Sequence, residues 1–84
     1  MTYYVYILKS KPTGRYYTGH TKDIDERLRR HNAGHSQSTK PYRPWKVVYT
    51  EEYSTRSEAM KRESEIKAKK NRQYIDWLVN NSDD

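Results

Sequence analysis

The chain has 84 residues, of which 32% are apolar, none is cysteine and nine are tyrosine, and its formal charge is +6. This length allows one domain with a thin core, and the composition excludes disulfides and thiolate zinc sites. No apolar run has the length of a membrane span or a signal peptide. We therefore expect a cytoplasmic protein without a membrane partner, whose positive charge favours a polyanion, most often nucleic acid.

The first half of the chain predicts a hairpin of two strands. Residues 3–8 are aromatic and β-branched with apolar side chains on both faces, which is typical of a central strand. Residues 9–14 contain proline and glycine and predict a turn into a second strand over residues 15–18. If these strands pair antiparallel, Tyr6 and Tyr17 lie on one face as neighbours.

A glycine turn at Gly19 and a basic helix are expected next. Asp23 can cap this helix by accepting a bond from the N–H of Glu26, and Gly34 can end it. Between these limits, four residues share one helix face: Ile24, Arg27, Leu28 and His31. An arginine and a histidine on that face either keep their heads in water at its edge or point into a cleft, and the spacing alone leaves both interpretations open.

The middle of the chain predicts an exposed loop and a third strand. Residues 34–44 are small, polar and proline-bearing, with Lys40 and Arg43 available to phosphates. A strand is expected over residues 45–50, where alternate residues share one face: Trp45, Val47 and Tyr49.

Thr55 and Glu58 form a capping box that predicts the start of a second helix. Its inward face includes a carboxylate among apolar residues: Ala59, Met60, Glu63, Ile66 and Lys67. A buried carboxylate is costly, so Glu63 must be paired, protonated or bound to a cation.

The C-terminal part predicts a last helix. Asn71 can cap it after the basic cluster of residues 67–70. Its inward side chains are expected to be Tyr74, Ile75 and Leu78, with Trp77 as a further candidate. One continuous helix over residues 55–79 is the alternative. We expect residues 1–80 to form a single domain and residues 81–84 to be a frayed tail.

Taken in order, these segments resemble the signature of the GIY-YIG nucleases. The matching motifs are Tyr4-Val5-Tyr6, Tyr17-Thr18-Gly19, Arg27, His31-Asn32 and Glu63. The closest likeness is to the small stand-alone, UPF0213-like branch, which is similar to the nuclease modules of the excision-repair protein UvrC and of Slx1-type nucleases. Tyr4 replaces the first glycine of the motif, and Thr18 replaces the isoleucine of its second half. The resemblance implies an α/β (α+β) sandwich, with a three-stranded antiparallel sheet flanked by about three helices.

The resemblance also implies metal-dependent hydrolysis of DNA phosphodiesters and a set of catalytic positions: Tyr6, Tyr17, His20, Arg27, His31 and Glu63. Glu63 would bind Mg²⁺ or Mn²⁺, for which one carboxylate is enough when phosphate and water complete the shell. Arg27 would hold phosphoryl oxygens. A phenol could act as the base; we favour Tyr6, with Tyr17 positioning the water or the phosphate, although the sequence leaves this order open.

The two histidines of that set have less defined predicted roles. His20 would hold a tyrosine hydroxyl or a phosphate, and His31 would orient Arg27 or touch phosphate. His31 and His35 do not predict a zinc pair, because Gly34 ends the helix between them and the sequence shows no third ligand.

Further basic residues are candidates for contacts to the nucleic-acid backbone: Lys40, Arg43, Lys67, Lys69, Lys70 and Arg72. Each is equally well explained as part of a solvated basic face. We expect little intrinsic sequence preference, so that DNA structure, as in damaged or branched DNA during repair or recombination, or a partner protein would select the target. Two alternatives are a nucleic-acid-binding or partner-docking module with weak or no cleavage, and a nuclease that acts on RNA.

Overall fold

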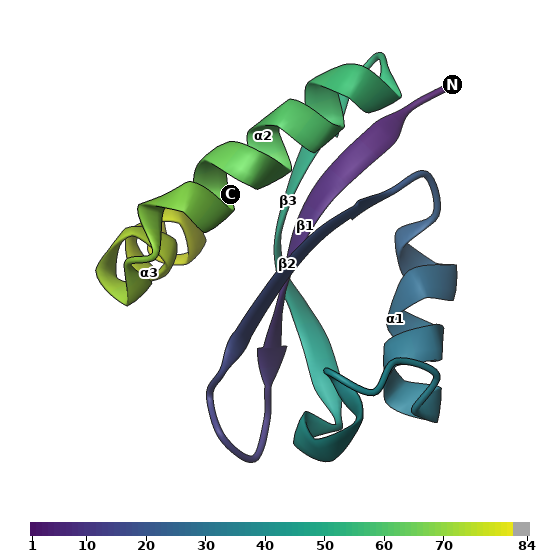
Figure 1. Cartoon of the computed structure of the whole chain (residues 1–84), viewed down its shortest axis with the longest axis vertical. Coiled ribbons are helices and arrows are strands. Elements are labelled where there is room, and N and C mark those ends of the chain that lie inside the picture. Colours follow the sequence, from purple (N-terminus) through teal and green to yellow (C-terminus); the bar gives the residue numbers. More distant parts are fainter. Residues whose placement is uncertain (82–84) are drawn as a thin grey trace.

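The protein is described by a computed structural model over residues 1–81, and it is built on one antiparallel sheet with helices on both faces (Figure 1). The strands are β1 (Tyr3–Ser10), β2 (Tyr16–Thr21) and β3 (Trp45–Tyr53). They are arranged in the order β2-β1-β3, so the first strand is central. This architecture confirms the predicted α+β fold, including the three antiparallel strands.

The helices are divided between the two sides of the sheet, as Figure 1 shows. One side carries α1 (Ile24–Ala33) and the short 3₁₀ helix η1 (Lys40–Tyr42), and the other carries α2 (Arg56–Lys69) and α3 (Arg72–Asn80). Within residues 1–81, no helix is both long enough and apolar enough to cross a membrane.

Most helix ends form where the capping residues predict them. Asp23 accepts a 3.0 Å bond from the amide of Glu26, and Gly34 ends α1 in the left-handed conformation. Thr55 and Glu58 form the reciprocal capping box of α2. Asn71 caps α3, so the alternative of one continuous C-terminal helix is wrong. Asn81, the first residue of the predicted tail, follows the last turn of α3, and the other tail residues lie outside the described part.

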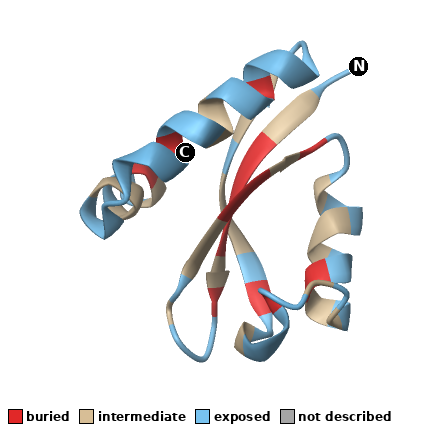
Figure 2. Ribbon diagram, in the orientation of Figure 1, coloured by how far each residue is buried: buried red, intermediate tan, exposed pale blue. Residues whose placement is uncertain are grey.

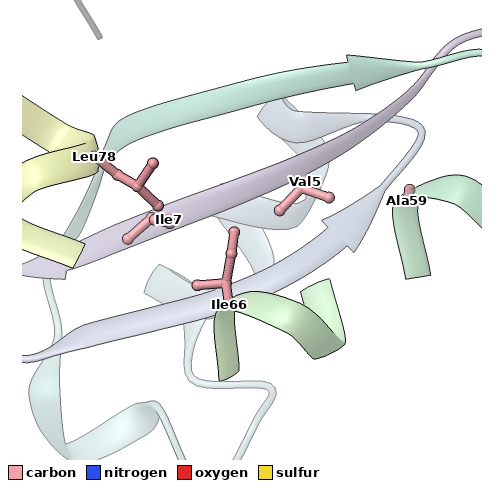
Figure 3. Close-up of a cluster of buried hydrophobic side chains, with 5 residues drawn as sticks. All are labelled: Val5, Ile7, Ala59, Ile66 and Leu78. Carbon is pink, nitrogen blue, oxygen red and sulfur yellow. The ribbon is translucent and has the colours of Figure 1, made fainter. Parts of the chain in front are cut away.

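The sheet separates two clusters of buried side chains, because successive residues of β1 point to opposite faces. Figure 3 shows the cluster on the side of α2 and α3: Val5, Ile7, Ala59, Ile66 and Leu78. The cluster on the side of α1 consists of Tyr6, Leu8 and Trp45. Burial is concentrated on the strands, while the outer faces of the helices are exposed (Figure 2).

Two local predictions are wrong because the strands differ from their expected course. Gly19 does not form a turn; it lies inside β2, which extends to Thr21. A β-bulge shifts the β1–β3 register so that Leu8 pairs with Val47 while Ile7 pairs with Tyr49. Tyr49 therefore faces α2 and α3 rather than sharing a face with Trp45 and Val47.

The predicted inward faces of the C-terminal helices are also partly wrong. Met60 and Trp77 are 46% and 59% exposed, whereas Ala59, Ile66 and Leu78 are buried as expected. The side of α2 between Ala59 and Ile66 is instead covered by Arg62, which is 22% exposed.

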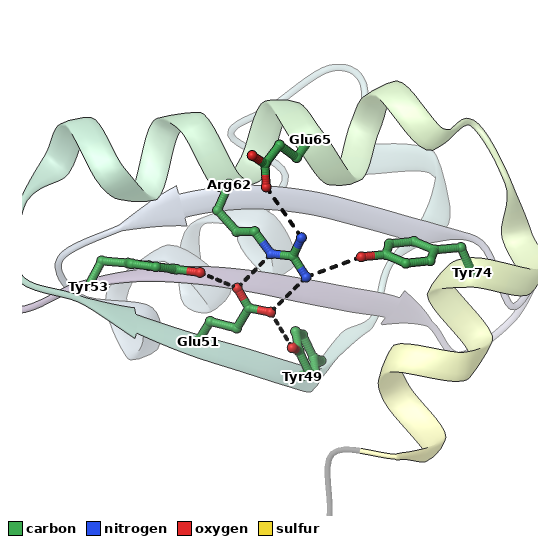
Figure 4. Close-up of polar contacts among 6 residues, drawn as sticks. All are labelled: Tyr49, Glu51, Tyr53, Arg62, Glu65 and Tyr74. Atoms are coloured by element: carbon green, nitrogen blue, oxygen red, sulfur yellow. Dashed lines mark hydrogen bonds and ion pairs between the residues drawn. The ribbon is translucent and has the colours of Figure 1, made fainter.

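Arg62 joins β3 to α2 through a polar network that Figure 4 shows. Its Nε and Nη2 atoms donate to the two carboxylate oxygens of Glu51 at 2.9 and 3.1 Å, and Nη2 also contacts the hydroxyl of Tyr74 at 3.2 Å. Tyr49 and Tyr53 donate their hydroxyls to the same carboxylate. Burial and the acceptor carboxylate together raise the pKa of each of these two phenols to about 12. The network lies at the β3 edge, away from the residues that the motifs single out.

Candidate functional site

The two motif tyrosines are neighbours on the face of the sheet that α1 covers. In the antiparallel register Tyr6 pairs with Gly19 and Leu8 pairs with Tyr17, so Tyr6 and Tyr17 are diagonal neighbours. Their ring centroids lie 6.4 Å apart. The predicted juxtaposition of the two phenols is therefore confirmed.

Gly19 is required by this packing rather than by a turn. A Cβ at position 19 would lie 2.6 Å from the hydroxyl oxygen of Tyr6 and 2.8 Å from its Cζ. Only glycine leaves room for the Tyr6 ring to cross β2. The ring is almost fully buried, with 2% of the residue exposed.

His31 of α1 contacts the hydroxyl of Tyr6 and holds it in place. Its Nε2 lies 3.2 Å from that hydroxyl, and its Nδ1 lies 2.9 Å from Oγ1 of Thr39. The Thr39 hydroxyl donates to the carbonyl of Ser36, so we assign the ring proton to Nδ1 and the acceptor lone pair to Nε2. In this assignment Tyr6 donates to a neutral imidazole.

The burial of this pair sets its electrostatics. Desolvation, and to a smaller extent Tyr17, raise the pKa of Tyr6 above its usual range, although the charge of Arg27 opposes the rise. Desolvation, followed by the charge of Arg27, lowers the pKa of His31. His31 is 4% exposed and its ring centroid is 4.8 Å from that of Tyr17. Its position is that of a buried support for both phenols, not of a side chain directed at solvent.

Arg27 lies one helical turn before His31 on the inner face of α1 and is half-buried. Among residues 1–81 no carboxylate lies within 4.0 Å of its guanidinium. A surface salt bridge, the simpler explanation of an arginine here, is therefore not formed in the described part of the chain. Its charge acts on Tyr6 and His31.

Glu63 is paired, as the sequence requires of a carboxylate within an apolar stripe. Its Oε1 lies 2.5 Å from Nδ1 of His20 on β2, and its Oε2 lies 2.6 Å from Nζ of Lys67 one turn along α2. Burial alone would raise the pKa of this carboxyl, but the hydrogen bonds from Lys67 and His20 outweigh it, so the pKa of Glu63 is lowered. Glu63 is thus an ionised carboxylate with 16% of its side chain exposed.

The helices that carry Arg27 and Glu63, α1 and α2, lie on opposite sides of the sheet (Figure 1). Arg27 approaches from α1 and Glu63 from α2, and the charges of both act on the hydroxyl of Tyr6. Lys67 links the two halves, because its ammonium lies over the ring of Tyr17, 5.9 Å from the centroid. The six predicted catalytic positions therefore form one constellation around an edge strand.

The other predicted basic contacts are not gathered with this constellation. Lys40 and Arg43 flank the C-terminal end of α1, against Gly34. Lys69 lies over the ring of Tyr74, and Arg72 over that of Tyr16. Lys70 ends α2 in the left-handed conformation. Lys67 alone among them contacts a predicted catalytic residue in the described part of the chain.

Two supporting residues were not assigned roles from the sequence. Thr39 is 1% exposed and holds the second nitrogen of His31. Asn32 exchanges two hydrogen bonds with the backbone of Trp45, at 2.6 and 3.1 Å, and so ties the end of α1 to β3. The position of Asn32 beside the motif histidine could have indicated a supporting role, whereas nothing in the sequence of the loop around Thr39 indicates one.

A resident metal would have few protein ligands here. Within residues 1–81 no group of three or more histidine, aspartate or glutamate side chains could hold an ion. Glu63 nevertheless has the character of a cation ligand, because the ammonium of Lys67 already lies against one of its oxygens. A single ionised carboxylate fits Mg²⁺, which keeps most of its waters.

Comparison with known proteins matches residues 2–76 to the model of the GIY-YIG catalytic domain. A UPF0213 protein of Staphylococcus saprophyticus is 50% identical over 66 residues, which cover 77% of this chain and 79% of that protein. A UPF0213 protein of Staphylococcus aureus is 48% identical over 67 residues, covering 79% and 80%. The solution NMR structure of a UPF0213 protein from Bacillus halodurans is similar with a TM-score of 0.61 and 36% identity, over 98% of this chain and 86% of that one.

Proposed function

This chain belongs to the GIY-YIG catalytic domain family, and from that membership we propose that it is a divalent-metal-dependent endonuclease that hydrolyses phosphodiester bonds in DNA. The observation that carries the proposal is the convergence of Tyr6, Tyr17, Arg27 and Glu63 on the β2 edge. The two phenols, the guanidinium and the carboxylate come from two strands and two helices, and the two helices lie on different faces of the sheet. They suit one scissile phosphate.

Arg27 supplies the positive charge that the reaction needs. Attack on phosphorus builds negative charge on the phosphoryl oxygens, and a guanidinium can bond two of them while keeping its own proton. Because no carboxylate neutralises Arg27 within residues 1–81, its donors are available to a phosphate.

Glu63 would hold the metal, with Mg²⁺ or Mn²⁺ as the expected ion. When bound there, the ion would polarise the phosphoryl group and stabilise the leaving oxygen. Lys67 would have to release Oε2, whereas His20 can keep its bond to Oε1 and so fix the orientation of the carboxylate.

Tyr6 and His31 together can accept the proton of the attacking water. Because the pKa of Tyr6 is raised by burial, its phenol does not ionise in advance. It can instead take a proton from water as its own proton passes to Nε2 of His31, 3.2 Å away. The water oxygen then bonds to phosphorus, the bond from phosphorus to one sugar oxygen breaks, and solvent protonates that oxygen. Tyr17 positions the water.

A nicking assay on supercoiled and branched DNA with Mg²⁺ or Mn²⁺ tests the proposal. Glu63→Gln and Arg27→Gln should each reduce the rate at least about 10²-fold, the usual loss when one charge-stabilising group is removed. The matched controls are Glu52→Gln on β3 and Arg29→Gln on the outer side of α1, both exposed, which should cleave at the wild-type rate. Cleavage that survives in both site variants, or in excess chelator, would exclude this site as the source.

One observation favours a second candidate, a module that binds nucleic acid with little or no cleavage. Both oxygens of Glu63 already have cationic or hydrogen-bonding partners, so the fold is satisfied without an ion. Salt-dependent binding without metal-dependent cleavage of flaps, branches or damaged duplexes would favour this candidate. Parallel DNA and RNA hairpins in the same assay decide which nucleic acid is the substrate, and addition of a partner protein tests whether a partner selects the target.

A further inference from the structure

A hollow of about 240 Å³ lies beside the proposed active site, between the start of β1, the end of β2 and the first turns of α1 and α2. Thr21, the last residue of β2, and the first turn of α1 line one part of it, and Arg56 at the start of α2 lines another. Its lining combines cationic, acidic and aromatic side chains, which include Tyr3, His20, Lys22, Glu26, Arg27 and Arg56. The sequence analysis gave no role to Lys22 or Arg56.

The hollow carries excess positive charge. Lys22, Arg27 and Arg56 line it, and among residues 1–81 none of them has a carboxylate within 4.0 Å. The lining carboxylate, Glu26, is an exposed side chain whose Oε2 lies 3.5 Å from Nε of Arg30. Like charges that converge on a concave surface raise the local potential, and an anion that enters relieves their repulsion.

A second hollow shows what a cation with a structural role looks like in this protein. Arg62 lines the depression between α2 and α3, but it donates to Glu51 through two nitrogens and contacts Glu65 and Tyr74 as well. The guanidinium is thus committed to its neighbours. Within residues 1–81 the side chains of Lys22 and Arg56 form no ion pair with a carboxylate, and both residues are exposed.

The cationic hollow is continuous with the proposed active site through two shared residues. Arg27 belongs to both, and His20 lines the hollow while its Nδ1 holds Glu63 at 2.5 Å. A phosphate bound between Lys22 and Arg56 would therefore be adjacent to one held at Arg27. Nucleic acids provide such neighbouring phosphates along one strand.

We infer that this hollow is a second phosphate-binding site, in which Lys22 and Arg56 hold the phosphate next to the scissile one. The inference rests on the proposed function, because it takes nucleic acid as the ligand. The bound group is either an internal phosphodiester or a terminal phosphate of a strand end, since both present the same anionic oxygens.

Binding of a fluorescent DNA duplex to the full chain in excess chelator, at a series of salt concentrations, tests the inference without cleavage. Each lost phosphate contact should reduce the slope of log K against log salt by about 0.9, which corresponds to roughly eightfold weaker binding at 0.1 M salt. We expect this change for Arg56→Gln and for Lys22→Gln. Arg56→Lys should retain the wild-type slope.

Lys61→Gln, which removes the same charge from an exposed position of α2 outside the hollow, is the matched control and should leave the slope unchanged. Thermal unfolding of each variant verifies that it is folded. If Arg56→Gln and Lys61→Gln have the same slope, the inference is wrong.

Two further arms identify the source of the phosphate and separate this inference from the proposed function. If the hollow holds an internal phosphodiester, duplexes with and without a 5′-phosphate bind equally. If the wild type prefers the 5′-phosphorylated duplex and Arg56→Gln removes that preference, the hollow holds the terminal phosphate of a strand end. If no substrate is ever nicked but the Arg56 dependence of binding is found, the nuclease proposal fails and the phosphate site stands. If nicking depends on Glu63 while Arg56 and Lys22 do not affect binding, the nuclease proposal stands and the second phosphate site is wrong.

Discussion

Gly19→Ala provides the sharpest test of how β2 accommodates the buried phenol. The new methyl carbon would lie 2.6 Å from the hydroxyl oxygen of Tyr6 and 2.8 Å from its Cζ, far inside the separation of about 3.5–4.0 Å at which carbon atoms pack. Tyr6 cannot move aside easily, because it is 2% exposed and its hydroxyl is bonded to His31. The backbone at position 19 is not in the left-handed region, so alanine adds no backbone strain to the clash.

The expected magnitude follows from opposing effects. Overpacking of this kind costs about 1–3 kcal/mol, and the weakened bond between Tyr6 and His31 adds roughly 0.5–1.5 kcal/mol. Alanine restricts the unfolded chain more than glycine does and returns about 0.4–1 kcal/mol. The net loss is about 1–3 kcal/mol, which for a domain of this size lowers Tm by roughly 5–20 °C.

Urea and thermal unfolding followed by circular dichroism measure this loss. Tyr6→Phe removes the closest atom, so Gly19→Ala should cost less in that background, and the double-mutant cycle should report a coupling of at least about 0.5 kcal/mol. Nicking by Gly19→Ala should fall as well, because the phenol is displaced. A variant as stable as the wild type, with no coupling to Tyr6→Phe, would refute the packing role of the glycine.

Three further predictions follow from the charged groups. Lys67→Met should bind Mn²⁺ about two- to threefold more tightly in a direct titration, since the half-exposed Lys67 ammonium, in a pair of about 0.5 kcal/mol, no longer competes for Glu63; an unchanged or weaker affinity would contradict competition at this carboxylate. The pKa of His31 is lowered in the folded protein, so the unfolded chain binds the proton first and stability should fall as pH drops below about 6.5; the urea midpoints at pH 7.5 and 5.5 should differ less in His31→Gln. Although burial alone would raise the pKa of Glu51, hydrogen bonds from Arg62 and two tyrosines lower it, so its contribution is present above its unfolded pKa and lost as pH falls through the folded value. Arg62→Met should cost about 1.5–3 kcal/mol at neutral pH, and equal urea midpoints for the variant and the wild type would show that the network is dispensable.

The sequence predicted those features that depend on local chemistry. Asp23, Thr55 and Asn71 each cap a helix where a short polar side chain precedes a helical pattern. The position of Tyr6 and Tyr17 as neighbours on one face followed from alternation in two adjacent strands. The need of Glu63 for a partner followed from its position in an apolar stripe. That position did not predict that the partners are His20 and Lys67.

What the sequence did not predict depends on contacts between distant segments. Gly19 suggested a turn, because glycine has the same local signature in a turn as at a close approach of a ring. The bulge near Val48 shifts the register by one residue, and such a shift moves each later side chain to the other face. It is this shift that brings Tyr49, Glu51 and Tyr53 toward Arg62.

The two edges of the sheet differ in how their polar groups are held, and this difference bears on the proposed reaction. At the β3 edge the carboxylate of Glu51 is bound by a guanidinium through two nitrogens and by two phenols, so any change there costs several bonds at once. At the β2 edge Glu63 is held by one histidine and by the half-exposed Lys67, and exposed pairs of this kind are weak. Every buried side-chain polar atom within residues 1–81 has a partner, and the rings of Tyr6 and His31 are bonded to each other and to Thr39. Of the groups in the proposed site, Lys67 alone would have to move to admit an ion at Glu63. Its ammonium is half-exposed and is paired with that one carboxylate, so moving Lys67 is the least costly change available.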